Sequence, residues 1–312
     1  MIKYQAKDFI QTREGLVFAV VEEGLEQGNV LCFLRYQWQG EVWKKLATGV
    51  SNQLLAEQYP HYLFYSTVKS AHLHAVPVAD ITIHHQPKKR LQQILSKHEP
   101  DKVEQDLIDL CQLFQTQGLS LDNLGITGSL LIAAQNPKSD IDIVAYGRDN
   151  FHKLRVSLMD LLDAGKLEHL DEEAWHVSYQ RRQCDLSYAD YVWHEQRKYN
   201  KALANQRKID LNLLAEEPVA DSAIYEKKGA IKIRATVADA QYAFDYPAKF
   251  IIDHPDIAEV LCYTATYTGQ AVAGEVIEVA GQLEHSCTGR QRIIVGSTRE
   301  ARGEYIKVVA VA

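Results

Sequence analysis

Residues 128–146 (GSLLIAAQNPKSDIDIVAY) constrain the fold of this 312-residue chain more than any other stretch. They follow a short apolar run at 124–127 and end in a strand-like run at 141–146. Side chains alternate between the two faces of a strand, so Asp140 and Asp142 are expected on the same face. The stretch therefore predicts a strand, a Gly128–Ser129 turn, and a second strand that carries two carboxylates on one face.

The flanking patterns divide the chain into three predicted domains. Strand-like runs at 15–22 and 29–36 suggest a mixed α/β domain over 1–97. Helical stripes alternate with strands over 98–217, where a helix starts at a capping box of Asp101 and Glu104. Six strand-like runs follow residue 218 and predict a small β-domain over 218–312, for which a barrel is one arrangement. The predicted fold class is α+β, with a mixed-sheet core between two further domains.

Composition excludes several classes of protein. The chain is 46% hydrophobic and 24% charged, as in soluble globular proteins, and its net charge is −7. This charge argues against a generally sticky nucleic-acid binder but leaves room for a local basic groove. No apolar run approaches the roughly 18 residues that span a bilayer, and the first ten residues lack the apolar core of a signal peptide. Five scattered cysteines form no CxxC pair, so we expect a cytoplasmic protein that makes no membrane contact.

A third carboxylate extends the candidate site. Asp210 lies between apolar neighbours in the strand-like run 209–214. If this strand neighbours the one with Asp140 and Asp142, three carboxylates converge, and such a cluster repels itself unless cations are present. Carboxylate oxygens suit Mg²⁺, which also binds triphosphate oxygens. A solvated strand edge after the turn is the simpler alternative for Asp140 and Asp142.

A predicted helix over 187–203 carries a second group of candidate residues. Its period brings Arg197, Lys198 and Lys201, together with His194, to one side. They would contact a triphosphate or a nucleic-acid backbone. A solvated basic face is the alternative.

Aromatic residues recur in the first domain and also allow two interpretations. Phe18, Phe33, Tyr36, Trp38 and Trp43 alternate as in a half-buried sheet. The alternation favours core packing over base stacking.

The order GS, ten residues, DxD and then a later strand Asp resembles the DNA polymerase beta-like nucleotidyltransferase superfamily. The segments HLHAVP (72–77) and GSTREARGEYIKV (296–308) are similar to those of an uncharacterised family of predicted nucleotidyltransferases. The resemblance implies two Mg²⁺ ions bound by Asp140 and Asp142, with Asp210 on the ion that activates the acceptor hydroxyl and as its general base. It also implies that Gly128 and Ser129 hold the β- and γ-phosphates of a nucleoside triphosphate, with ATP as the expected donor.

The resulting expectation is an enzyme that moves a nucleoside monophosphate group to a hydroxyl on RNA, a protein or a small molecule. One alternative is a nucleotide- or RNA-binding module without turnover, although the intact Asp140, Asp142 and Asp210 argue against it. Another is an enzyme that modifies a partner protein by AMPylation. The terminal domains favour a large acceptor such as RNA, whereas the net charge does not. The oligomeric state stays open.

Overall fold

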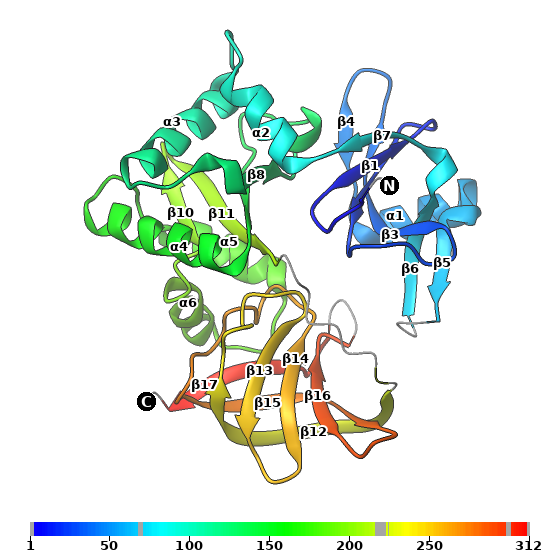
Figure 1. The fold of residues 1–312 in the computed structure, drawn as a ribbon, viewed down its shortest axis with the longest axis vertical. Coiled ribbons are helices and arrows are strands. Elements are labelled where there is room, and N and C mark those ends of the chain that lie inside the picture. The colour runs from blue at the N-terminus through cyan, green and yellow to red at the C-terminus, as the bar shows by residue number, and fades with distance from the viewer. Residues whose placement is uncertain (1–2, 68–70, 216–222, 224, 298–300, 311–312) are drawn as a thin grey trace. The chain divides into compact units, whose positions relative to one another are not determined.

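The computed structural model describes residues 3–67, 71–215, 223, 225–297 and 301–310. Helices and three separate β-sheets follow one another in the chain, which confirms the predicted α+β class (Figure 1). Two compact units form: one comprises residues 1–146 and 204–214, and the other comprises 147–203 and 215–312. No helix in the described residues is long and apolar enough to cross a membrane.

The first sheet is antiparallel and buries both faces. Its strands are β1 (Phe9–Thr12), β2 (Leu16–Val20), β3 (Asn29–Trp38), β4 (Trp43–Lys45), β5 (Leu63–Ser66), β6 (Ala71–Pro77) and β7 (Ile81–His85). They run in the order β5-β6-β3-β2-β1-β7, and β4 pairs with β3. Leu16 and Phe18 point to one face, where Leu55 of helix α1 (Thr48–Gln58) packs. Val17 points to the opposite face and packs near Leu131, as the period of two requires.

The second sheet is mixed, as predicted, and its strands β8 (Leu124–Thr127) and β9 (Ile141–Tyr146) flank the Gly128–Ser129 turn. Its order is β10 (Lys201–Ala204), β11 (Arg207–Leu214), β9 and β8. Strands β9 and β11 are parallel, whereas β8 and β9 are antiparallel. Helices α2 (Pro87–Leu95) and α3 (Lys102–Thr116) precede it, and α3 begins at the predicted capping box of Asp101 and Glu104.

Three helices precede strand β10 in the second unit: α4 (Arg148–Asp163), α5 (Glu172–Arg182) and α6 (Tyr188–Gln196). The predicted helix over 187–203 is wrong in its second half. Arg197 is already the C-terminal cap of α6, Tyr199 has a left-handed φ of +47°, and β10 begins at Lys201. A left-handed residue ends an α-helix, so residues 197–201 share no helical face.

The third sheet closes on itself. Its strands are β12 (Tyr225–Asp239), β13 (Ala248–Asp253), β14 (Ile257–Cys262), β15 (Val276–Ser286), β16 (Gln291–Val295) and β17 (Tyr305–Ala310). Strands β12, β13 and β14 pair consecutively, and β15 returns beside β12, which is the Greek-key order. Strand β16 then joins β15 to β14 and completes a ring, so the barrel-like arrangement is the one that forms.

Each predicted domain contains one of these three sheets, but the compact units follow other boundaries. The middle segment 98–217 is divided, since residues 147–203 belong to the unit of the barrel. The apolar core of that unit includes Trp175 and Tyr191 of helices α5 and α6 beside Val237 and Phe250 of the barrel. The predicted boundary at 217/218 lies outside the described residues.

Candidate carboxylate site

The strand register places Asp142 in the middle of the candidate site. In the parallel pair of β9 and β11, Asp142 is directly opposite Asp210. In the antiparallel pair of β8 and β9, Asp142 is directly opposite Thr127, the residue before Gly128. Asp140 lies two residues before Asp142, immediately ahead of β9. The sheet therefore brings the Gly128–Ser129 turn and the three carboxylates to one place in the first unit.

Gly128 cannot be replaced there without strain. Its φ is +70°, a conformation that disfavours a side chain, and a Cβ would overlap the Oδ2 atom of Asp142. Ser129 follows as the N-terminal cap of the three-residue 3₁₀ helix Leu130–Ile132, and its hydroxyl makes no cap hydrogen bond. The turn thus brings its backbone close to the Asp142 carboxylate.

A lysine lies between two of the three carboxylates. Lys208 forms an ion pair with Asp210, and its Nζ lies 3.9 Å from Oδ2 of Asp140. Burial raises the pKa of Asp142 to about 6, and the negative charges of Asp210 and Asp140 add to this increase. The positive charges of Lys208 and Lys45 oppose it. Mutual repulsion among the carboxylates is therefore only partly neutralised by protein cations.

The three carboxylates are the type of ligand that a hard divalent cation prefers. Burial is the first cause of the raised pKa of Asp142, and the negative charges of Asp210 and Asp140 are the second and third. In the described residues, no group of three or more His, Cys, Asp or Glu side chains is placed to hold a metal ion. Asp210 instead pairs with Lys208. The Mg²⁺ site of Asp140, Asp142 and Asp210 therefore stays a prediction from the sequence.

The N-terminal segment contributes a lysine that the sequence analysis missed. Lys7 has a left-handed φ of +76°, and its carbonyl accepts a hydrogen bond of 2.9 Å from the Thr127 hydroxyl. Its Nζ donates to Oδ1 of Asn212, 3.2 Å away on strand β11. Burial lowers the pKa of Lys7, and the charge of Asp142 opposes that shift. Nothing in the period or spacing of residues 1–10 indicates this position.

Strands β3 and β4 add a tyrosine and a second lysine. Tyr36 and Lys45 are opposite each other in this pair. Burial is the main cause that raises the pKa of Tyr36 to about 12, and Asp142 also raises it. Since Lys45 in turn lowers the pKa of Asp142, this end of the first sheet lies within electrostatic reach of the carboxylates.

The predicted basic group on the helix is engaged elsewhere. Lys198 is 1% exposed, and its Nζ donates to Glu195 at 2.5 Å and to the Thr266 carbonyl at 2.8 Å. Lys201 pairs with the same Glu195, and Arg197 pairs with Glu275. A common basic face is therefore a wrong prediction, because these cations neutralise buried carboxylates of the second unit. The nucleotide-binding role predicted for them loses its geometric basis.

His194 belongs to this buried framework too. Its Nε2 accepts a hydrogen bond from the backbone N–H of Val308 at 3.1 Å, and its Nδ1 lies 2.7 Å from the Asp190 carbonyl. Burial lowers the pKa of His194 to about 4, so the ring is neutral near pH 7.

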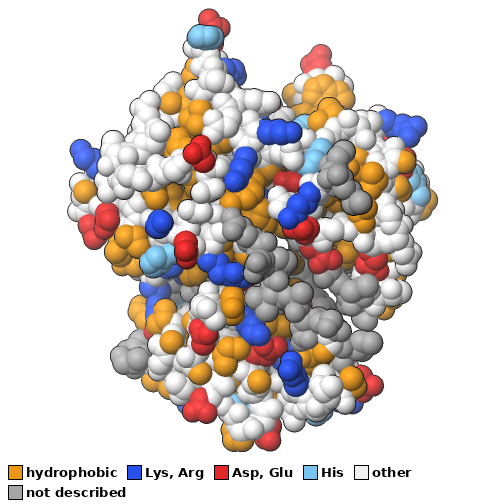
Figure 2. All heavy atoms as spheres, in the orientation of Figure 1, with side chains coloured by type: hydrophobic (Ala, Val, Ile, Leu, Met, Phe, Trp, Pro, Cys, Tyr) orange, Lys and Arg blue, Asp and Glu red, His pale blue; other side chains and the backbone are white. Residues whose placement is uncertain are grey.

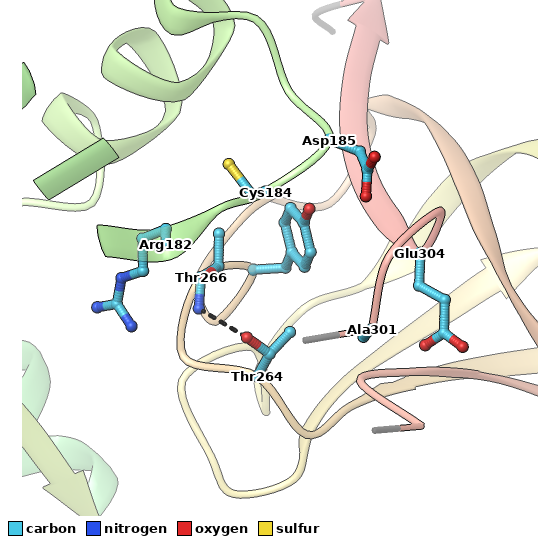
Figure 3. A pocket seen from close by; sticks show the side chains of 8 residues that line it. Arg182, Cys184, Asp185, Thr264, Thr266, Ala301 and Glu304 are labelled. Carbon is cyan, nitrogen blue, oxygen red and sulfur yellow. Dashed lines mark hydrogen bonds between the residues drawn. The ribbon is translucent and has the colours of Figure 1, made fainter. Parts of the chain in front are cut away.

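A small pocket in the second unit contains none of the predicted site residues (Figure 3). Glu304 on its wall already accepts hydrogen bonds from the backbone N–H groups of Gly296 and Ser297. The pocket is lined by Arg182, Cys184, Asp185, Thr264, Thr266, Tyr267, Ala301 and Glu304. Basic and acidic side chains are interspersed on the face in Figure 2, as expected for a net charge of −7.

The fold and site define an α+β protein with three carboxylates on neighbouring strands of a mixed sheet and a Gly–Ser turn beside them. No family model matches the chain. The chain is 33% identical over 339 aligned residues to Uncharacterized protein MJ1086 of Methanocaldococcus jannaschii, covering 98% of this chain and 99% of that protein. The chain belongs to the family of that archaeal protein.

Proposed function

We propose that the protein is a cytoplasmic, metal-dependent nucleotidyltransferase. It would move a nucleoside monophosphate group from a nucleoside triphosphate, with ATP as the expected donor, to a hydroxyl acceptor. One observation carries the proposal: Asp142 and Asp210 are direct partners on parallel strands, and the side chain of Asp142 meets Gly128. Bound Mg²⁺ would stabilise charge on the phosphate oxygens and make the acceptor hydroxyl more acidic.

The chain's own residues have distinct tasks in this reaction. Gly128 and Ser129 would bind the β- and γ-phosphates through backbone groups and the Ser129 hydroxyl. Asp210 would accept the proton of the acceptor hydroxyl, whose oxygen forms a bond to the α-phosphorus. The bond from the α-phosphorus to the bridging oxygen then breaks, and pyrophosphate leaves with that electron pair. Lys7 supports this site through Thr127 and Asn212, which hold its backbone and its ammonium group.

The Lys208–Asp210 ion pair favours a second candidate, a nucleotide-binding module without turnover. In that case the lysine would be the permanent counter-ion of the carboxylates, and a nucleotide would bind without Mg²⁺. Calorimetry of ATP binding with Mg²⁺ and with EDTA separates the two. Equal affinity under both conditions would favour the binding module.

The direct test of the enzyme uses Asp142→Asn and Asp210→Asn. Each variant removes one anionic ligand and nearly preserves shape, so we expect transfer of label from α-³²P-labelled ATP to fall at least 100-fold. A 100-fold loss corresponds to about 2.7 kcal/mol of transition-state stabilisation. Asp163→Asn, at an exposed position at the end of α4, is the matched control and should keep full activity. Full labelling by Asp142→Asn would contradict the proposal.

A further inference from the structure

A hairpin of the first sheet carries an aromatic ribbon that ends near the carboxylates. The ribbon consists of Tyr36, Trp38, Trp43 and Lys45 on strands β3 and β4. Tyr36 is opposite Lys45, and Trp38 is opposite Trp43, so all four side chains share one face of the hairpin. Tyr36 packs in one cluster with Leu131 of the segment that follows the Gly128–Ser129 turn, and Asp142 lies within electrostatic reach of Tyr36 and Lys45.

The ribbon becomes more exposed away from the carboxylates. Tyr36 is 3% exposed, whereas Trp38 is 43% exposed. The ring centroids of Trp38 and Trp43 lie 5.0 Å apart in an edge-to-face arrangement. Core packing therefore explains Phe18 and Tyr36, which are buried, but leaves the indole of Trp38 open to solvent.

The backbone of Trp38 is held by close contacts with neighbouring residues. The backbone N–H of Trp38 donates to the Gly15 carbonyl at 2.8 Å, and a Cβ on Gly15 would approach the Trp38 Cβ to 2.9 Å. On the buried side, Tyr36 and Val17 pack with Leu131, directly after the Gly128–Ser129 turn. The hairpin is thus fixed to the same loop that forms the candidate site.

Local charge distinguishes this hairpin from the rest of the chain. The ribbon face carries Lys45, and the opposite face of the hairpin carries Arg35 and Lys44, against the single acid Glu41 in residues 35–45. The whole chain carries −7. A single exposed tryptophan needs no explanation, but a fixed indole pair beside a lysine and next to a reaction site suits unpaired bases and phosphates.

We propose that the aromatic ribbon binds the single-stranded end of a polynucleotide acceptor, with bases on Trp38 and Trp43 and a phosphate at Lys45. This inference rests on the proposed function and names its substrate class. Two strand residues span about 7 Å, so the indoles lie about that far along the hairpin from the Tyr36–Lys45 pair. Aromatic side chains stack on bases of any sequence, so binding tolerates sequence changes.

The test measures binding of a fluorescein-labelled oligouridylate 12-mer by fluorescence anisotropy, in EDTA and without nucleotide. We expect Trp38→Ala to weaken binding at least about fivefold, and Trp38→Phe to restore part of it. Trp193→Ala is the matched control, because Trp193 is also 43% exposed but lies in the second unit. Lys45→Gln should reduce the slope of log Kd against log salt concentration by about 0.7, the value for one phosphate contact on a single strand.

The oligonucleotide-binding assay tests the ribbon assignment, whereas transfer of label from ATP tests the proposed function. Asp142→Asn should bind the oligonucleotide at least as well as the wild type, since it only removes a negative charge. If Asp142→Asn stays active while Trp38→Ala loses binding, the proposed function fails and the ribbon assignment stands. Absence of oligonucleotide binding by the wild type, or equal binding by well-folded Trp38→Ala and Trp193→Ala, would overturn the ribbon assignment.

Discussion

Under the proposed function, Asp142 is required for catalysis, yet its charged side chain destabilises the metal-free fold. Its carboxylate is opposite Asp210, next to the glycine turn, and partly buried, so its charged form is disfavoured without a bound cation. Residues that serve a reaction frequently reduce the stability of the empty protein. The conflict is measurable, because a raised pKa links protonation of one side chain to the stability of the fold.

Asp142→Asn should stabilise the metal-free protein near neutral pH. The pKa of Asp142 is about 6 in the folded protein and 3.8 in the unfolded chain, so the folded state binds the proton more tightly. Stability from this group is present below about pH 4 and is lost as the pH rises through 6. In EDTA, we expect the variant to melt about 2 °C or more above the wild type at pH 7.5, and the difference to shrink at pH 5. A difference that does not depend on pH would contradict this account.

Gly128→Ala tests the close approach of the turn to Asp142. The new Cβ meets both a left-handed φ of +70° and the Asp142 carboxylate. We expect a loss of about 2 to 4 kcal/mol in the free energy of unfolding, measured in urea. Gly118→Ala is the control, since Gly118 has φ +79° but nothing within 4 Å of a Cβ. It should lose only about 1 kcal/mol, the strain of the backbone. Equal losses would show that the contact with Asp142 is unimportant.

The segment after helix α6 is held by a buried charge network rather than by helical propensity. Glu195 accepts from both Lys198 and Lys201, and Lys198 also donates to the Thr266 carbonyl. Burial lowers the pKa of Lys198 to about 8, and the charge of Glu195 limits that decrease. The network joins the end of the helix, the start of strand β10 and the loop after β14.

Glu195→Gln should destabilise this network strongly. The variant leaves the buried Lys198 ammonium without its counter-ion, and breaking a buried pair in this way costs about 3 to 5 kcal/mol. Chemical denaturation measures the loss. The double variant Glu195→Gln with Lys198→Met removes the unpaired charge as well and should recover part of the stability. If the double variant is no more stable than Glu195→Gln, the unpaired Lys198 ammonium is not the cause of the lost stability.

The complete chain folds as two units that each use distant parts of the sequence. The barrel completes its core with side chains from helices α5 and α6, among them Trp175 and Tyr191. Burial of apolar surface is the main stabilising contribution to a fold of this size. A fragment that starts at residue 218 would therefore expose the surface that these helices cover.

We expect the fragment 218–312 to lack the cooperative melting of the whole protein. Exposed apolar surface should bind the dye ANS, and circular dichroism should show a broad transition. The intact chain provides the comparison under the same conditions. A sharp transition without ANS binding would show that the barrel is complete without helices α5 and α6.

The sequence by itself determined the features that depend on neighbours along the chain. The period of two placed Asp140 and Asp142 on one face, the capping box located the start of α3, and turn residues separated the strands of the barrel. Only the tertiary structure decided which strands pair. The parallel register that sets Asp210 opposite Asp142 joins residues 68 positions apart, and no local pattern specifies it.

Local patterns also do not specify which distant residues pack together, and this explains the site residues that the sequence did not predict or predicted wrongly. Lys7 and Lys45 reach the carboxylates because one sheet packs against the loop of another, which a periodic pattern cannot express. Arg197, Lys198 and Lys201 were predicted on a solvated or ligand-binding face. Arg197 instead pairs with the distant Glu275, and Lys198 and Lys201, which lie beyond the end of α6, turn back to Glu195 within that helix. The exposure of a charged side chain depends on which distant groups pack over it, so the fold alone decided whether these cations face a ligand or neutralise the core.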